Sequence, residues 1–229
     1  GRLRVSAPAD LAAISLAPMF AAFTRDFPEV QLDLDMSPRY VDMIGESFDL
    51  AIRVGEAEAQ QHLTTRHLID LEIGLYAAPA YLATPVMSPD DLPQRDMLML
   101  MSDGSPVPWV MNRGGEVLTI DAKSRRITAN SYYVLRRLAL LGAGISSLPE
   151  IFAADHRRSG ALIRVLPDWT LRPASVRAVF PSRRLMPQKT RAFLDMLLVF
   201  LKQSHLHQAA DTGEDVYASM PPVPPAQLP

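Results

Sequence analysis

Two short polar segments of the sequence have the composition of ligand-binding loops. Ser6-Ala7-Pro8-Ala9-Asp10 follows a strand pattern, and Asn130-Ser131-Tyr132 opens a helical pattern. The first backbone N–H groups of a helix have no intrahelical acceptor, and the helix dipole is positive at that end. Both segments would therefore favour a carboxylate or another anion. The alternative is that Ser6 and Asn130 only form turns or helix caps, where these residue types are enriched.

A third candidate segment, Arg53-Val54-Gly55, ends a mostly apolar run over residues 48–55. An arginine at the end of such a strand can hold an anionic ligand through two parallel hydrogen bonds. The alternative is that Arg53 pairs with Asp49 or another nearby carboxylate. Gly55 would let the backbone turn close to a ligand, because glycine has no Cβ.

Three carboxylates beside these segments argue for a different ligand charge. Asp10 ends the first segment, and Glu56 and Glu58 follow the third. They leave room for a cationic, zwitterionic or neutral ligand, because a nearby carboxylate repels an anion. The alternative is that these side chains only face solvent. The sequence therefore predicts a small-molecule site without fixing the charge of its ligand.

Signatures of catalytic, metal and cofactor sites are absent from the sequence. There is no cysteine, and the five histidines do not form an H-E-x-x-H pattern. Neither a G-x-S-x-G elbow, a P-loop nor a G-x-G-x-x-G fingerprint occurs. Gly142-Ala143-Gly144 precedes a strand pattern, which is the wrong context for a phosphate cradle. We therefore expect no catalytic residue, no metal and no cofactor.

The composition is that of a globular chain that does not bind DNA by itself. Of its 229 residues, 48% are hydrophobic, which is enough for one large domain or two small lobes. Lys and Arg number 23 against 25 Asp and Glu, so the basic face of a self-sufficient DNA binder is missing. No apolar run approaches the roughly 20 residues that span a bilayer, and we expect no secretory signal.

The first quarter of the chain alternates strand and helix patterns, as in α/β proteins. Residues 3–5 and 30–36 predict strands, and residues 48–55 predict a strand covered on both faces. Pro18 either kinks the intervening helix or lies in its first turn. Residues 40–46 predict a short helix. Apolar residues at helical spacing form one buried stripe on the first helix: Leu16, Met19, Phe20, Phe23 and Phe27.

The remaining patterns continue this alternation. Residues 85–93 hold three prolines and predict a surface loop, and residues 97–130 predict short strands. Asn130-Ser131 would cap a helix that ends at Gly142. Trp109 is either a lid over a ligand or a core residue. The last predicted elements are a strand over 145–148, a helix from Pro149, a strand over 176–180, an amphipathic helix from Pro187, and a polar tail.

Taken in order, these segments resemble the effector domains of LysR-type transcriptional regulators. The resemblance runs from Leu3 to about Leu201. It rests on an ordered set of short motifs: Leu3-Arg4-Val5-Ser6-Ala7-Pro8, Leu16-Ala17-Pro18, Phe27-Pro28-Glu29-Val30, Phe48 to Gly55, Ala78-Pro79-Ala80-Tyr81-Leu82, Ala129-Asn130-Ser131, Gly142-Ala143-Gly144-Ile145, Leu148-Pro149, Gly160 to Trp169 and Phe180 to Arg184. Phe48 to Gly55 resembles the third strand of the family, and Ala78 to Leu82 resembles the motif that marks the passage into its second lobe.

The resemblance implies an α/β fold of the type II periplasmic-binding-protein kind, with two Rossmann-like lobes joined by a two-crossover hinge. Lobe I would comprise residues 1–77 and 178–205, lobe II residues 78–177, and residues 206–229 a disordered tail. A small effector would bind in the cleft between the lobes. The residues lining that cleft would be Ser6, Ala7, Pro8, Asp10, Arg53, Val54, Gly55, Asn130, Ser131 and Tyr132.

The resemblance also implies partners. The chain would be the sensor of a cytoplasmic, membrane-free transcription factor that binds promoter DNA only through an N-terminal winged helix-turn-helix domain absent from this sequence. It would form a homodimer or homotetramer, with lobe I against lobe II. The helical stripe from Leu16 to Phe27 and the helix over 131–142 would offer apolar faces for this contact. The alternatives are an exported solute-binding protein and an enzyme with the same fold.

Overall fold

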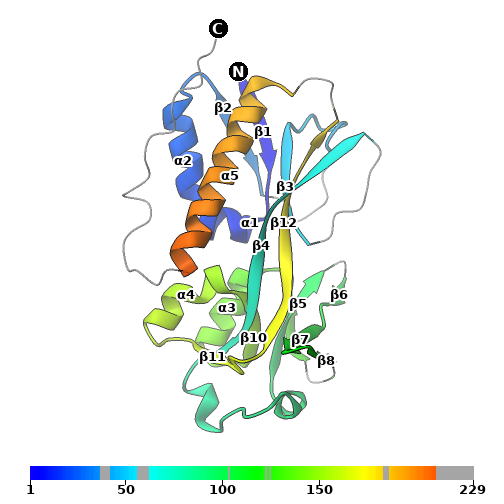
Figure 1. The fold of residues 1–229 in the computed structure, drawn as a ribbon, viewed down its shortest axis with the longest axis vertical. Helices are drawn as coiled ribbons and strands as arrows, with labels where there is room; N and C mark the ends of the chain where they lie inside the picture. The colour runs from blue at the N-terminus through cyan, green and yellow to red at the C-terminus, as the bar shows by residue number, and fades with distance from the viewer. Residues whose placement is uncertain are drawn as a thin grey trace. The chain divides into compact units, whose positions relative to one another are not determined.

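The computed structural model describes residues 1–36, 42–55, 62–102, 104–121, 123, 125–182 and 186–209 (Figure 1). The chain divides into two compact units. Unit 1 consists of residues 1–70 and 175–229, and unit 2 of residues 71–174. Two long strands, β4 (Leu63–Ala77) and β12 (Thr170–Pro181), each run from one unit into the other.

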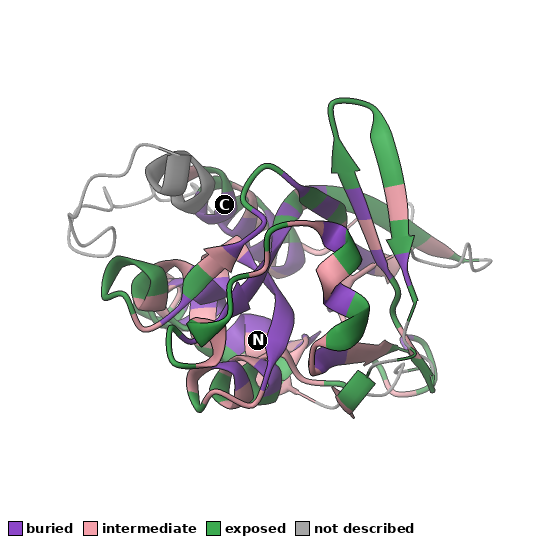
Figure 2. Cartoon of the chain, turned by 90° about the horizontal axis from the view of Figure 1, so that it is seen from below, coloured by how far each residue is buried: buried purple, intermediate pink, exposed green. Residues whose placement is uncertain are grey.

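The sheet of unit 1 contains the strands that the sequence predicts. β1 (Arg2–Ser6) lies parallel to β2 (Gln31–Asp35) on one side and to β3 (Leu50–Val54) on the other. β12 then pairs antiparallel with β3, so β2 is the edge strand. Figure 2 shows that the strands in the interior are largely buried, whereas much of the periphery is exposed. β3 is buried at Leu50, Ala51 and Ile52, on both of its faces, as expected of a strand covered on both sides.

The predicted helical stripe of unit 1 forms its core. A short α-helix, α1 (Ala9–Leu11), continues through a π-helical turn over Ala12–Leu16 into α2 (Ala17–Asp26), and Pro18 lies in the first turn of α2. The ring of Phe20 stacks on Phe193 of α5 (Gln188–Ala209) at 6.1 Å. Leu16, Met19, Phe20 and Phe23 are at most 8% exposed. The expectation that this stripe offers an uncovered face for self-association is therefore wrong.

The predicted short helix over residues 40–46 is wrong for the part that the structure describes, since Met43 to Ser47 form turns. The Asp42 carboxylate accepts hydrogen bonds from the backbone N–H groups of Ile44, at 3.1 Å, and Gly45, at 2.9 Å. An aspartate that bonds its own backbone in this way competes with helix formation. Residues 40 and 41 of this prediction lie outside the described residues.

The sheet of unit 2 is built around β10 (Ile145–Pro149). This strand runs antiparallel to β4 and parallel to β5 (Met97–Ser102), and β9 (Arg125–Ala129) lies parallel to β5. The remaining strands are β6 (Ser105–Pro106), the hairpin of β7 (Trp109–Arg113) and β8 (Glu116–Ile120), and β11 (Ile163–Val165). Of these, β11 is the strand that the sequence patterns did not predict.

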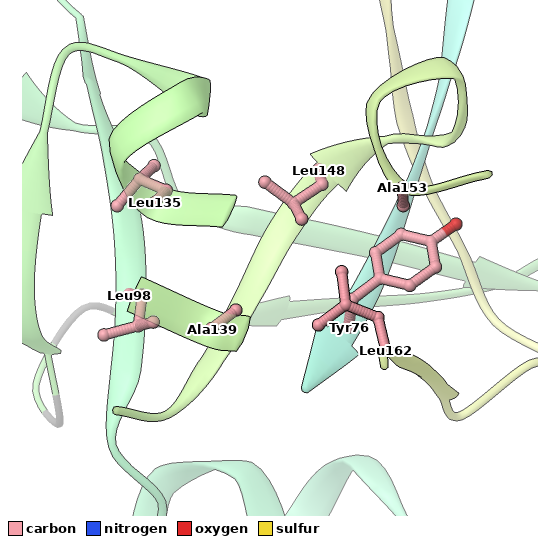
Figure 3. Packing of buried hydrophobic residues seen from close by; sticks show 7 residues of the cluster. All are labelled: Tyr76, Leu98, Leu135, Ala139, Leu148, Ala153 and Leu162. Atoms are coloured by element: carbon pink, nitrogen blue, oxygen red, sulfur yellow. The ribbon is translucent and has the colours of Figure 1, made fainter. Parts of the chain in front are cut away.

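Two helices complete the core of unit 2. They are α3 (Tyr132–Leu140) and α4 (Glu150–Arg158). Figure 3 shows their apolar side chains packed with those of the strands: Tyr76, Leu98, Leu135, Ala139, Leu148, Ala153 and Leu162. The predicted loop over residues 85–93 contains part of a 3-10 helix over Pro89–Gln94. A capping box between Ser88 and Asp91 stabilises the start of this helix. A further 3-10 turn spans Tyr81–Ala83.

The boundaries between the two units lie inside strands. The division falls inside β4, after Asp70, and inside β12, before Ser175, since both strands have residues in each unit. The helix α5 continues to Ala209, past the residue at which we expected the tail to begin. No helix among the described residues is both long and apolar enough to cross a membrane.

Candidate functional site

The predicted residues of unit 1 centre on a contact between Ser6 and Arg53. Ser6 is the last residue of β1 and is fully buried. Arg53 donates to the Ser6 hydroxyl from Nη1 at 3.1 Å and from Nη2 at 3.2 Å, and Nη1 also donates to the carbonyl of Ile52 at 2.9 Å. The two side chains meet because the parallel register places Ser6 opposite Ala51, on the same face as Arg53.

Asp49, the carboxylate considered as a partner of Arg53, instead forms an ion pair with Lys189. The carboxylate of Asp49 lies 2.9 Å from Nζ of Lys189. The same carboxylate accepts a hydrogen bond from the backbone N–H of Arg4 at 3.0 Å. Asp49 therefore ties α5 to the sheet of unit 1, while the guanidinium of Arg53 is turned toward the end of β1.

The segment after β1 is more fully hydrogen-bonded than the sequence suggests. The N–H of Ala7 donates to the carbonyl of Asp35 at 3.0 Å, so the expectation that this group is free for an anion is wrong. Pro8 precedes α1, and its carbonyl accepts from the N–H of Ala12 at 3.0 Å. Asp10 lies in the first turn of α1. Residues 56–61, which include Glu56 and Glu58, lie outside the described residues.

The end of β3 has the geometry that its glycine predicts. Gly55 has a φ of 101°, a left-handed conformation that glycine adopts without strain. Its N–H donates to the carbonyl of Ser175 at 2.8 Å, which joins the end of β3 to β12. Val54 is the last residue of β3 and lies opposite Val176. The Arg53-Val54-Gly55 segment is thus held in place by strand pairing up to its last residue.

In unit 2, the cap of the predicted helix is Ser131. Its hydroxyl accepts a hydrogen bond from the N–H of Val134 at 3.2 Å, which satisfies one of the unpaired donors at the start of α3. Asn130, which we expected to share this role, is exposed and lies one residue further from the helix. The ring of Tyr132 packs edge-on against Phe152 of α4 at 5.8 Å.

Sequence reasoning missed Arg177, which lies directly opposite Arg53 in the antiparallel pairing of β3 and β12. No local pattern could have revealed this neighbour, because the pairing joins segments far apart in the chain. Opposing residues of an antiparallel pair project to the same face of the sheet. Two arginines therefore share the face of unit 1 on which the hydroxyl of Ser6 lies.

A second polar cluster, in unit 2, is structural. Arg164 of β11 donates from Nη1 to the hydroxyl of Tyr76 at 2.7 Å and to the carboxylate of Glu150 at 3.2 Å. Tyr76 itself donates to Glu150. Burial, followed by the hydrogen bond with Glu150, raises the pKa of the Tyr76 hydroxyl. Gly74 leaves room for the guanidinium, since a Cβ there would lie 1.9 Å from Nη1 of Arg164.

The structure offers no metal site among the described residues, in which no three His, Asp or Glu side chains are grouped suitably for an ion. His67 pairs with Asp70 at 2.9 Å on the exposed side of β4. Trp109 is 2% exposed, so it is a core residue and not a lid. The cluster of Ser6, Arg53 and Arg177 is a set of hydrogen-bond donors, which suits recognition of a ligand.

Comparison with known proteins shows the family of the chain. Residues 1–201 match the family model described as the LysR substrate binding domain. The chain is 35% identical over 199 residues to the HTH-type transcriptional regulator PtxR of Pseudomonas aeruginosa. It is 32% identical over 203 residues to the HTH-type transcriptional regulator CrgA of Neisseria meningitidis. These matches cover 86% of the chain in both cases, but the chain spans only 63% of PtxR and 66% of CrgA.

Solved structures show the same fold. The CrgA regulatory domain of Neisseria meningitidis matches with a TM-score of 0.75 and 30% identity, covering 87% of this chain and 98% of that domain. The full-length Vibrio cholerae virulence activator AphB matches with a TM-score of 0.75 and 27% identity, covering 87% of this chain and 68% of AphB. The chain therefore belongs to the LysR substrate-binding domain family, the effector-binding domains of LysR-type transcriptional regulators with the type II periplasmic-binding-protein fold.

Proposed function

We propose that this chain senses a small metabolite and passes the signal to a larger transcription factor of which it is part. The match of residues 1–201 to the effector-binding family carries the proposal. An exported solute-binding protein, the alternative with the same fold, is disfavoured because the relatives are HTH-type transcriptional regulators. The chain's role is then binding and not catalysis, with no cofactor required.

The proposed binding residues belong to two segments of unit 1 and one segment of unit 2. In unit 1, the hydroxyl of Ser6 and the guanidinium of Arg53 are held at the end of strands by the contacts described above. In unit 2, Ser131 fixes the start of α3, so neighbouring side chains project from a rigid element. The full set is Ser6, Ala7, Pro8, Asp10, Arg53, Val54, Gly55, Asn130, Ser131 and Tyr132.

The remainder of the regulator supplies the other partners in this proposal. The chain spans about two thirds of the length of its curated relatives, and a helix-turn-helix domain outside it would bind promoter DNA in the cytoplasm. Copies of the chain would pair as a homodimer or homotetramer. The exposed apolar side chains of α3 and its C-terminal end support a contact there: Tyr133 at 52%, Val134 at 44% and Leu141 at 67% exposure.

A thermal-shift screen of the chain against a metabolite library tests the sensing function. A ligand present at about 100 times its Kd stabilises the folded state by about 2.7 kcal/mol. For a chain of this size, that corresponds to a rise in Tm of about 5–10 °C. We expect a small number of chemically related metabolites to give such a shift. If no metabolite in a library of cellular acids, amines, sugars and aromatics raises the Tm, the chain is not a small-molecule sensor.

A further inference from the structure

One mostly buried arginine of unit 2, Arg164, connects three elements. In the antiparallel pairing of β11 with β4 it lies directly opposite Tyr76. Its guanidinium donates to the hydroxyl of Tyr76 at 2.7 Å and to the carboxylate of Glu150, in the first turn of α4, at 3.2 Å. It also donates to the carbonyl of Trp169, the residue before β12, at 3.3 Å. A single side chain therefore contacts β4, α4 and the segment that leads into β12.

Stability alone does not account for this network. The side chains of Arg164 and Glu150 are 17% and 21% exposed. Nε of Arg164 is buried and has no hydrogen-bond partner among the described residues. The desolvation of a buried ion pair often cancels its attraction, so apolar side chains of similar volume are frequently as stable or more stable. The best-attested use of such a group is to specify one structural arrangement over its alternatives.

The arrangement that needs specifying here is the register of β11. This strand has three residues, Ile163–Val165, which lie antiparallel to Leu75–Ala77 at the end of β4. A slip by two residues keeps every side chain on its face of the sheet, because side chains alternate with a period of two. The apolar side chains of so short a strand therefore specify its register weakly. After such a slip Arg164 would face Gly74 or Ala78, about 7 Å from its present position.

Gly74 fits the present register. It lies two residues before Tyr76, so it is the diagonal neighbour of Arg164 across the strand pair. A Cβ at Gly74 would lie 1.9 Å from Nη1 of Arg164, so the guanidinium occupies the space that a side chain would fill. A displacement of about 7 Å would take the guanidinium out of this space. It would also take it out of hydrogen-bond reach of Glu150.

The register of β11 also fixes where β12 begins. Only residues 166–169 separate the two strands. The N–H of Trp169 donates to the carbonyl of Leu166 at 2.9 Å, which closes this connection into a turn. β12 continues from it by pairing with β7, with Thr170 opposite Asn112. Because β12 contributes residues to both units, the start of this strand matters beyond β11 itself.

We infer that Arg164 is a register lock: its hydrogen bonds are satisfied in one pairing of β11 with β4, and this fixes the start of β12. The inference goes beyond the proposed sensing function and does not depend on it. Loss of the lock frees β11 to slip while the core of unit 2 stays packed. Arg157 provides a matched control, since it binds the same carboxylate of Glu150 at 3.2 Å. It has no hydrogen bond to β4 or Trp169 within the described part of the chain.

Disulfide trapping measures the register, because the chain has no cysteine of its own. Directly opposite Cα atoms lie about 4.5–5.5 Å apart, within reach of a disulfide, whereas diagonal pairs at about 7–8 Å are not. Ile163→Cys with Ala77→Cys reports the present register. Val165→Cys with Ala77→Cys, and Ile163→Cys with Leu75→Cys, report slips by two residues in either direction. Mass spectrometry detects the disulfides after treatment with oxidised glutathione.

Without a further substitution, we expect a disulfide in the first cysteine pair and none in the other two. Arg164→Met should add a disulfide in at least one slipped pair. Gly74→Ala, which displaces the guanidinium without removing its charge, should do the same. Arg157→Met should give the parent pattern. The inference is overturned if Arg164→Met traps only the present register, or if Arg157→Met slips as much as Arg164→Met.

Hydrogen exchange gives the answer without cysteines, should a cysteine pair prevent folding. Arg164→Met should speed the amide exchange of β11 and of Trp169 by about tenfold or more, because a strand that slips opens its hydrogen bonds locally. The amides of β9, in the same unit, should keep their parent rates. Arg157→Met should leave all of these rates unchanged. Parent-like exchange of β11 and Trp169 in Arg164→Met would overturn the inference.

Discussion

We propose that Ser6 and Arg53, at the ends of β1 and β3, form part of a binding surface whose side chains are already held in place. A serine hydroxyl buried at the end of β1 needs a partner, and the parallel register supplies it from β3. The guanidinium is in turn held in one orientation by Ser6 and by the carbonyl of Ile52. A side chain already fixed before a ligand arrives loses less conformational entropy on binding, which favours affinity.

Asp70 offers a test of the hydrogen bonds on β4 and β12. The hydrogen bond from Ser175, followed by that from His67, lowers the pKa of the Asp70 carboxyl from its ordinary value of 3.8. We predict that Ser175→Ala raises this pKa toward 3.8, as measured by NMR titration of the carboxyl carbon. Ser159→Ala, which removes a hydroxyl bonded to the carbonyl of His156, should leave it unchanged.

The sign of the effect on stability follows from the direction of the pKa shift. Because the pKa of Asp70 is lower in the folded state, its ionised form favours folding. That contribution is fully present above the ordinary pKa and is lost as the pH falls through the lowered value. The stability difference between the parent chain and Ser175→Ala should therefore narrow below pH 3.8. An unchanged Asp70 pKa in Ser175→Ala would contradict the assigned cause.

At the scale of elements, the helix cap at the start of α3, Ser131, can be tested separately from Asn130, a proposed ligand contact. Ser131→Ala removes the hydrogen bond to the N–H of Val134 and should lower the free energy of unfolding by about 1 kcal/mol. Asn130→Ala, at the exposed neighbouring position, should change it by less than about 0.5 kcal/mol. Urea denaturation measures both values. Equal losses in the two variants would show that the cap is assigned to the wrong residue.

The sequence predicted most elements because their signals are local. Each of these signals determines the backbone within one strand or one helical turn. Examples are the alternation of Leu3 and Val5, Pro18 at the start of α2, and Gly142 after α3. The turn at Asp42 was missed because its side chain, and not the spacing of apolar residues, decides the backbone conformation. The short strand β11 was missed because it depends on pairing with β4.

The candidate site was only partly predictable for the same physical reason. Ser6, Arg53 and Gly55 were singled out because each follows or ends a recognisable strand. Arg177 was not, because its relation to Arg53 depends on a register between segments more than a hundred residues apart. The hydrogen bond from the Ala7 N–H to the carbonyl of Asp35 is likewise a tertiary contact, which a local sequence pattern does not reveal.

At the scale of the whole molecule, two features of the chain serve a sensor. The chain forms two compact units, and the strands β4 and β12 each contribute residues to both of them. A ligand that changes the population of conformations must bind them with different affinities. We propose that such a difference in affinity lets the effector act on transcription through the larger regulator, since the relatives of the chain are HTH-type transcriptional regulators.

Calorimetric titration with the metabolite that raises the Tm most is the most direct test of the sensing site. We predict that Ser6→Ala weakens binding by about 1–3 kcal/mol, because a ligand atom or Arg53 loses its partner. Ser15→Ala is the matched control, since Ser15 is also buried in unit 1 and its hydroxyl has no partner among the described residues. It should bind like the parent chain. Equal affinity of a folded Ser6→Ala variant and the parent chain would contradict the placement of the effector site.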